Sequence, residues 1–377
     1  FAALVGLFGC VSALSAQGRS ELLLEKNWKF TREDNNEFIK PAFDDSKWQS
    51  VTVPHDWAIY GPFSSLNDKQ EVAISQDGQK EAMEHAGRTG GLPFVGVGWY
   101  RTEFDVPQFQ AGKRATILFD GAMSHANVYI NGQKVGYWPY GYNSFHFDIT
   151  KYLKPGEKNT LAVRLENLPE SSRWYPGAGL YRNVHLIITE DAYIPVWGTY
   201  ITTPSVNEKF AKVNVRTKVV LPEGADPAKY SVETSVWNPN KQKLTAVRTS
   251  LAQMKYNNNQ AEQEFVIQTP SLWSPEMPAL YSAETRLYEG DKLKDIYTTP
   301  FGIRSIEIIP DKGFFLNGKR TVFKGVCNHH DLGPLGAAVN DAAIRRQIRI
   351  LKDMGCNAIR TSHNMPAPEL IRACDEM

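Results

Sequence analysis

The chain has 377 residues, more than one hydrophobic core normally supports, so its length predicts two or three domains. Hydrophobic residues make up 42% and charged residues 22%, as in ordinary soluble globular proteins. The formal net charge of +1 argues against nucleic acid and anionic membranes as partners. The 9 Trp, 16 Tyr and 18 Phe are expected mainly to fill cores, and some to form flat platforms for sugar rings.

The first segment, Phe1 to Ala16, is uncharged and apolar, and Leu14-Ser15-Ala16 resembles a cleavage site after a signal peptide. It is too short for a membrane span of about 20 residues. We therefore expect residues 1–16 to be part of a signal peptide whose basic start and initiator Met precede Phe1, and the protein to be exported to the periplasm or beyond. Lipid anchoring at Cys10 is the weaker alternative, because Phe8 fits a lipobox poorly.

Residues 20–190 are predicted to form a jelly-roll β-sandwich, because short β-type runs alternate with turns and no long helical period appears. Asn131-Gly132 is typical of a two-residue hairpin turn, and it places Val128 and Ile130 on one face. The polar, glycine-rich segment Ser64 to Gly98 is expected to be a long loop, ordered against another domain or a ligand. The predicted strands are Trp48–Val53, Trp99–Val106, Ala115–Phe119, Ala126–Ile130, Lys134–Trp138, Phe145–Ile149, Thr160–Leu165 and Val184–Ile188.

Residues 193–300 predict a second β-sandwich, immunoglobulin-like but without a cysteine pair for an inter-sheet disulfide. Its predicted strands are Lys212–Val220, Tyr230–Trp237, Leu244–Gln253, Glu262–Gln268 and Tyr281–Tyr288.

After Gly302 the pattern changes to strand–helix alternation. A strand at Thr321–Val326 precedes a helix at Asp341–Met354, with Gly355 at the position of a helix C-cap. A second strand, Cys356–Thr361, precedes a helix that begins at Ala367. Two such units predict a parallel sheet, either doubly wound or a barrel. Cys327, Cys356 and Cys374 lack CxxC spacing and are expected to be buried free thiols.

Several motifs resemble glycoside hydrolase family 2. Phe301-Gly302-Ile303-Arg304, Phe323-Lys324-Gly325-Val326, Asn328-His329-His330-Asp331 and Gly355 to His363 are similar to the first strands of that family's catalytic barrel. Pro54-His55-Asp56-Trp57 and Ser172 to Arg182 resemble its sugar-binding jelly roll, and Ser271 to Pro275 its middle sandwich. The resemblance implies a multidomain fold: a galactose-binding-like jelly roll, an immunoglobulin-like sandwich, and the incomplete start of a (β/α)8 TIM barrel at residues 301–377.

The resemblance also implies the reaction, which is hydrolysis with retention by two glutamates about 5–5.5 Å apart. A complete barrel needs about 250 residues, so both glutamates are expected after Met377, and this chain alone is expected to be inactive. Glu166, Glu369 and Glu376 are rejected as substitutes. The form Ser172-Arg173-Trp174-Tyr175-Pro176-Gly177 favours terminal β-D-galactosides as substrates. A β-glucuronidase, a β-mannosidase, or a non-catalytic carbohydrate-binding fragment stay open as alternatives.

Candidate substrate-binding residues follow from the same resemblance. His329 ends the first barrel strand, Arg360 lies in the second, and His363 is expected in the loop beyond, with Asn364 beside it. Arg173 and Trp174 of the jelly roll are expected near the mouth of the site.

The expected ligand is an oligosaccharide or glycan, and a homo-oligomer is compatible with the sequence. His330 and Asp331 resemble a metal cluster but lack further ligands at metal spacing, so no metal site is predicted. No cofactor is expected to be required. Ser171-Ser172-Arg173 replaces the acidic residue that binds sodium in long β-galactosidases, so Na or Mg in a complete enzyme finds no support here.

Overall fold

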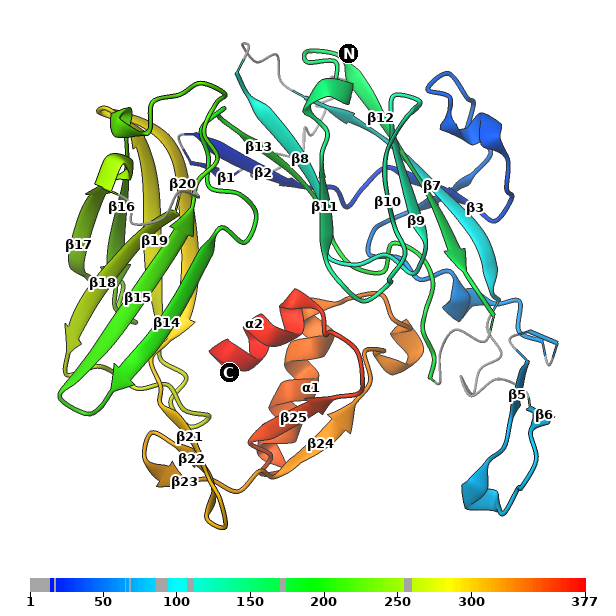
Figure 1. Ribbon diagram of the computed structural model, residues 1–377. Helices are drawn as coiled ribbons and strands as arrows, with labels where there is room; N and C mark the ends of the chain where they lie inside the picture. The colour runs from blue at the N-terminus through cyan, green and yellow to red at the C-terminus, as the bar shows by residue number, and fades with distance from the viewer. Residues whose placement is uncertain are drawn as a thin grey trace, which may run out of the picture.

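The computed structural model describes residues 14–16, 18–64, 66–67, 69–85, 94–106, 112–169, 174–253 and 260–377. Two β-sandwiches flank a small α/β segment, as Figure 1 shows. This arrangement confirms the predicted mostly-β, multidomain fold class. Most of the expected leader, including Cys10, lies outside the described residues. No helix in the described ranges is long and apolar enough to cross a membrane.

The first sandwich packs a five-stranded antiparallel sheet against a six-stranded one. In order across the five-stranded sheet, the strands are β1 (Leu14–Ala16), β2 (Arg19–Leu23), β13 (Val184–Thr189), β8 (Arg114–Phe119) and β11 (Phe145–Asp148). Across the six-stranded sheet they are β10 (Gln133–Trp138), β9 (Ala126–Ile130), β12 (Lys158–Asn167), β7 (Gly96–Asp105), β3 (Trp28–Thr31) and β4 (Gln49–Val51).

The predicted hairpin of this sandwich is confirmed. Asn131 and Gly132 have φ angles of 50° and 83°, and they join β9 to β10 in the two-residue register that pairs Gln133 with Ile130. Val128 and Ile130 are both fully buried in the core between the sheets, as the period of two requires.

The segment predicted as one long loop is only partly a loop. It contains a two-stranded hairpin of β5 (Gln70–Val72) and β6 (Met83–His85), which projects from the jelly roll in Figure 1, and its end belongs to strand β7. Gly98 lies in that strand, at a position where any side chain would collide with Trp57. A Cβ at residue 98 would stand 2.5 Å from the indole ring, which is itself fully buried.

Replacing Gly98 by alanine should therefore destabilise the protein by about 1–3 kcal/mol, because the buried Trp57 ring has to shift in a close-packed core. Urea denaturation followed by tryptophan fluorescence measures the loss. A change below about 0.5 kcal/mol would mean that the ring moves freely and that the contact does not constrain residue 98.

In the described part of the second sandwich there are seven strands, five of them at the predicted places. Its sheets have the orders β14-β15-β18 and β17-β16-β19-β20. The strands are β14 (Thr199–Val206), β15 (Phe210–Lys218), β16 (Tyr230–Trp237), β17 (Lys243–Ser250), β18 (Gln260–Gln268), β19 (Leu280–Glu289) and β20 (Lys292–Gly302). The two strands that the sequence did not predict, β14 and β20, are both edge strands and contain Pro204 and Pro300, residues that weaken a strand pattern.

A three-stranded meander, β21 (Ile306–Ile309), β22 (Gly313–Leu316) and β23 (Lys319–Arg320), leads into the α/β segment. Strands β24 (Gly325–Asn328) and β25 (Ala358–Thr361) are parallel, and helices α1 (Asp341–Asp353) and α2 (Pro368–Glu376) follow them. The Asn340 side chain caps the start of α1, and Gly355, with φ of 88°, follows its end as predicted.

The prediction of a first strand at Thr321–Val326 was wrong in position. Residues 321–324 belong to no strand, and Val322 and Phe323 are 57% and 62% exposed. The hydrogen bonds at the ends of this segment are local: Thr321 N–H donates to the Phe314 carbonyl at 2.9 Å, and Lys324 N–H donates to the Asn357 side chain at 2.8 Å. Pairing with β25, rather than the β-branched composition, decides where the strand lies. Short 3-10 turns complete the described chain: η1 (Asn36–Ile39), η2 (Ala58–Tyr60), η3 (Ser75–Asp77), η4 (Thr150–Tyr152), η5 (Pro227–Lys229), η6 (Leu251–Gln253) and η7 (Gly333–Leu335).

Candidate functional site

The carboxyl ends of β24 and β25 meet at one edge, since the two strands are parallel and Asn328 pairs with Thr361. His329 follows β24 directly, Arg360 lies in β25, and His363 follows β25 by two residues. The structure therefore brings these three predicted side chains together, with His363 in the loop as expected.

Three aromatic rings form the centre of this edge, from two different domains. The Trp174 indole, from the jelly roll, stacks on the His329 imidazole with centroids 4.0 Å apart and planes 11° apart. The His363 ring meets His329 edge-on at 5.9 Å. The Nε1–H of Trp174 donates to Asp331 Oδ1 at 2.7 Å, which fixes the rotation of the indole. We call Trp174, His329 and His363 the aromatic cluster.

Arg360 joins this cluster through His363. Its Nη2 lies 3.3 Å from His363 Nδ1, and because a guanidinium only donates, Nδ1 is the acceptor and the imidazole proton is on Nε2. Nη1 donates to Ser362 Oγ at 3.1 Å and to Cys327 Sγ at 3.5 Å. Hydrogen bonding of the Cys327 thiol to Arg360, and also to the side chain of Ser362, lowers the pKa of that thiol. Within the described residues, Arg360 forms no ion pair.

The expectation of buried thiols is wrong for Cys327, which is exposed at this edge, whereas Cys356 and Cys374 are partly buried and free.

Asn364 is placed beside the cluster but contacts the jelly roll. Its Oδ1 accepts a hydrogen bond of 2.8 Å from the hydroxyl of Tyr140, a residue that the sequence analysis did not single out. The available signal was an aromatic residue between Pro139 and Gly141, two residue types that favour turns. Arg173, with the Ser171-Ser172 pair that bears on sodium binding, lies outside the described residues.

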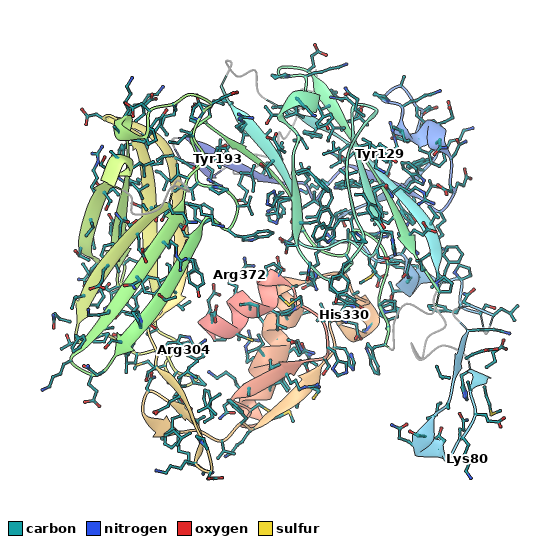
Figure 2. All side chains as sticks on the ribbon, in the orientation of Figure 1. Lys80, Tyr129, Tyr193, Arg304, His330 and Arg372 are labelled. Carbon is teal, nitrogen blue, oxygen red and sulfur yellow. The ribbon has the colours of Figure 1, made fainter. Side chains whose placement is uncertain are left out.

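His330 and Asp331, the residues that resembled a metal cluster, have other partners. His330 Nε2 is 2.9 Å from the carbonyl of Pro176, and its ring packs edge-on against Tyr142 and Tyr181 at the junction seen in Figure 2. Burial, assisted by the charge of Arg182, lowers the pKa of His330 to about 4. Over the described ranges, no group of three or more His, Cys, Asp or Glu side chains is placed to hold a metal ion.

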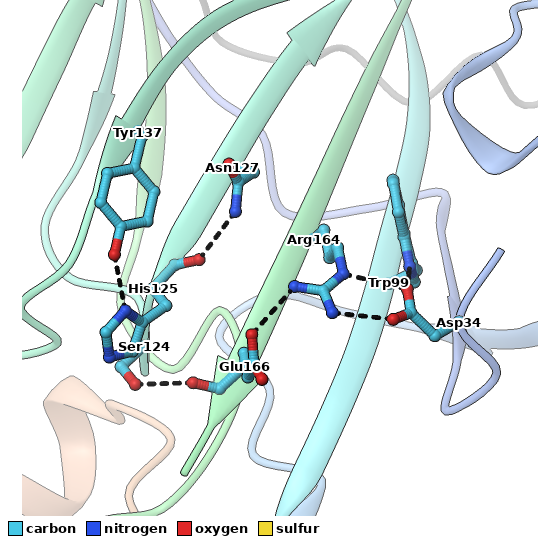
Figure 3. A network of polar contacts seen from close by, with 8 residues as sticks. All are labelled: Asp34, Trp99, Ser124, His125, Asn127, Tyr137, Arg164 and Glu166. Atoms are coloured by element: carbon cyan, nitrogen blue, oxygen red, sulfur yellow. Dashed lines mark hydrogen bonds and ion pairs between the residues drawn. The ribbon is translucent and has the colours of Figure 1, made fainter. Parts of the chain in front are cut away.

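None of the three glutamates rejected from the sequence belongs to the cluster. Glu166 is paired with Arg164 at 3.1 Å on the jelly-roll sheet, in a network that continues to Asp34 and the Trp99 indole (Figure 3). Glu369 accepts from Asn183 at 2.6 Å, and Glu376 is paired with Arg345. Their hydrogen bonds and ion pairs commit them to structural roles.

Two of the candidate residues, His329 and Asn364, line a cavity of about 30 Å³ together with jelly-roll residues and residues of helices α1 and α2. That is room for one or two water molecules and far below the ~300 Å³ of a small-molecule pocket. Trp174, Arg360 and His363 do not line this cavity.

The chain matches family models along nearly its whole length. Residues 22–190 match the sugar binding domain of glycosyl hydrolases family 2, residues 193–304 the family 2 domain that follows it, and residues 307–377 the family 2 TIM barrel domain.

Curated relatives include a β-galactosidase, BoGH2A, of Bacteroides ovatus, 41% identical over 98% of this chain and 42% of its own length. A putative β-glucuronidase of Formosa agariphila is 37% identical over 95% of this chain and 32% of its own length. The chain thus spans less than half the length of these relatives.

Solved structures agree in fold. A glycosyl hydrolase family 2 member from Bacteroides cellulosilyticus superposes with a TM-score of 0.83 at 35% identity, over 94% of this chain and 44% of its own. β-Glucuronidase 2 of Bacteroides uniformis superposes with a TM-score of 0.78 at 28% identity, over 95% of this chain and 41% of its own. These matches confirm that the two parallel strands begin a barrel rather than a doubly wound sheet.

Proposed function

Because the chain belongs to glycosyl hydrolases family 2, we propose that it is part of an enzyme that cleaves terminal β-D-galactosides with retention of configuration. The main support for a galactoside as the substrate is the match to a β-galactosidase at 41% identity over nearly the whole chain. The Ser-Arg-Trp-Tyr-Pro-Gly segment at residues 172–177, which supplies the aromatic cluster with Trp174, supports it.

In this proposal the aromatic cluster and its neighbours contact the sugar. His363, with its proton on Nε2, presents a donor to a sugar hydroxyl, and His329 offers a second polar contact held in place by Trp174. Arg360, Asn364 and Arg173 are the further binding residues. Each neutral hydrogen bond contributes only about 0.5–1.5 kcal/mol, so such contacts aid catalysis mainly where they strengthen in the transition state.

The two glutamates that retention requires are proposed to lie outside residues 1–377. The glutamates considered in this chain are engaged with Arg164, Asn183 and Arg345, away from the cluster. An arginine near the ends of the barrel strands would favour the charged form of a nucleophilic carboxylate brought next to it.

A β-glucuronidase is the second candidate, because relatives at 37% and 31% identity carry that name. Arg360 supports it, since a guanidinium without an ion pair among the described residues can bind the carboxylate of a glucuronide.

The protein is tested as residues 17–377 and as the product of the reading frame continued past Met377, on chromogenic β-galactoside, β-glucuronide and β-mannoside. We expect no turnover by residues 17–377. We expect the longer product to cleave the galactoside with a kcat/KM at least tenfold above the other two, a difference of about 1.4 kcal/mol in transition-state binding.

Preference for the glucuronide or mannoside would overturn the galactoside proposal. Turnover by residues 17–377 would overturn the placement of the glutamates. A longer product that binds galactosides in calorimetry without cleaving them would leave a carbohydrate-binding function in place of an enzyme.

We also propose export, on the apolar leader and its small-residue cleavage site at residues 14–16. Mass spectrometry of the mature N-terminus distinguishes cleavage after Ala16 from lipidation at Cys10.

A further inference from the structure

We propose that Asp56 of the jelly roll is a positioning residue for the candidate sugar site: its buried carboxylate holds one jelly-roll segment and one barrel loop together so that Trp174 stacks on His329. The contacts of Asp56 and the stacking of Trp174 on His329 are observed in the structure. Only the description of the aromatic cluster as a sugar site rests on the proposed function.

The carboxylate of Asp56 joins three separate segments of the chain. Oδ1 accepts from the backbone N–H of Ala58 at 3.0 Å, in its own turn, and from that of Ala178 at 2.9 Å, in the jelly-roll segment after Trp174. Oδ2 accepts from the Tyr175 hydroxyl at 2.5 Å and from the backbone N–H of Ala337 at 2.8 Å. Ala337 belongs to the loop between β24 and α1, so one side chain connects the jelly roll to the barrel.

All four of these partners are donors, which suits an ionised carboxylate. Burial raises the pKa of Asp56, whereas the hydrogen bonds from Ala337, Tyr175, Ala178 and Ala58 oppose that rise. The three backbone N–H groups can only donate and so oppose the rise in the pKa of Asp56, whereas the Tyr175 hydroxyl can donate or accept.

The backbone around the carboxylate is built for close approach. Gly177 and Gly336 have φ angles of 67° and 68°, a region that L-residues with a side chain rarely adopt. A Cβ on Gly336 would stand 2.5 Å from Asp56 Oδ2, and a Cβ on Gly177 would collide with the methyl group of Ala337. The two segments can therefore approach the carboxylate this closely only with glycine at positions 177 and 336.

The held segments lead directly to the aromatic cluster. Between Ala178 and Trp174, the carbonyl of Pro176 meets His330 Nε2 at 2.9 Å. One residue before His330 is His329, under the Trp174 ring, and one residue after it is Asp331, which accepts from Trp174 Nε1. Trp174 lies in the jelly-roll segment and His329 in the barrel loop. The position of one segment along the other therefore decides whether these two rings stack.

The test uses NMR of the 377-residue chain labelled at histidine, with the His329 resonance assigned from H329Q. Stacking under Trp174 should shift the His329 ring protons upfield, and W174A marks their unstacked position. Gly336→Ala pushes the barrel loop away from Asp56 and should move the resonance by at least half of that difference. Asp56→Asn, which turns an amide NH2 toward donors, should move it in the same direction.

The matched control is Gly333→Ala. Gly333 lies in the same loop with φ of 61°, but no atom stands within 4 Å of its Cβ position. This control should leave the His329 resonance unchanged.

A wild-type His329 resonance in both Gly336→Ala and Asp56→Asn, even with lowered thermal stability, would overturn the proposal and leave Asp56 a structural residue. If Asp56→Asn does not fold, the comparison of the two glycine variants decides alone. No step measures hydrolysis, so the result is independent of whether the chain belongs to a β-galactosidase.

Discussion

Replacing Asp295 by alanine should destabilise the protein by about 3–5 kcal/mol, because it leaves the Arg19 guanidinium buried without its counter-charge. The side chains of Arg19 and Asp295 are only 10% and 0% exposed, and they connect strand β2 of the jelly roll to strand β20 of the immunoglobulin-like sandwich. Arg19 donates from Nε to Oδ1 at 3.0 Å and from Nη2 to Oδ2 at 2.8 Å, a bidentate geometry.

The carboxylate of Asp295 also satisfies two backbone groups, the N–H of Ile194 at 2.8 Å and that of Ile296 at 2.9 Å. The Ile194 group lies in the connection between the two sandwiches, so the variant should loosen their junction as well as lower stability. We expect a single calorimetric transition of the parent chain to separate into two transitions in the variant.

The control for this prediction is the exposed pair of Lys212 and Glu264, whose side chains are 45% and 54% exposed. Glu264→Ala should cost at most about 1 kcal/mol, as exposed pairs do. A second variant, Arg19→Met with Asp295→Leu, removes both charges and should recover much of the loss. Equal losses for Asp295→Ala and Glu264→Ala would contradict the assignment of Arg19–Asp295 as the junction between the sandwiches.

Local sequence signals predicted those parts of the fold that local physics decides. The Asn131-Gly132 turn and the Gly355 helix end depend on positive φ angles, which few residues adopt, so the residue types reveal them. The predicted strand began too early because residues 321–323 have high β-propensity, whereas the ladder with β25 begins only at Gly325. β-Propensity describes fit to a pleated surface and not the presence of a partner strand.

The candidate site was predictable in one half only. The ends of parallel strands meet at one edge, so the strand pattern placed His329, Arg360 and His363 together. Its other half comes from residues far away in sequence, such as Trp174 against His329 and Tyr140 against Asn364. Only the resemblance indicated Trp174, and only the flanking Pro139 and Gly141 drew attention to Tyr140. Nothing in the sequence indicated the bridge from Asp56 to Ala337, because these contacts depend on how two domains dock.

Stability should be greatest near neutral pH and should fall on both sides, for opposite reasons at different histidines. Burial, assisted by the charge of Arg32, lowers the pKa of His55 to about 4, and burial has the same result at His330. Burial also lowers the pKa of His185, but hydrogen bonds to Asp120 and Glu21 outweigh it and raise that pKa to about 9.

The direction of each effect follows from which state binds more protons. Between pH 6.5, the ordinary histidine value, and about pH 4, the unfolded chain protonates residues 55 and 330 while the folded protein keeps them neutral, so the free energy of unfolding decreases as the pH falls. Each of the two histidines accounts for about 3 kcal/mol over that window. Between pH 6.5 and about pH 9 the folded protein holds the extra proton, on His185, so the stability that this group contributes is lost as the pH rises.

Two variants separate the acid limb from the alkaline limb of the curve of stability against pH, and each variant is the control for the other. His330→Phe keeps the ring packed between Tyr142 and Tyr181 but cannot bind a proton, so it should remove about half of the loss between pH 6.5 and pH 4 and leave the alkaline limb unchanged. His185→Gln should lower stability at neutral pH and flatten the loss between pH 6.5 and pH 9. Because His185 also lowers the pKa of Glu21, only the part of the acid loss that His55 and His330 cause should stay unchanged. Urea midpoints measured from pH 4 to pH 9 give both profiles. An acid limb that is equally steep in His330→Phe and in the parent chain would assign the acid loss to carboxylates such as Asp34, whose hydrogen bond from Arg164 lowers its pKa, rather than to the buried histidines.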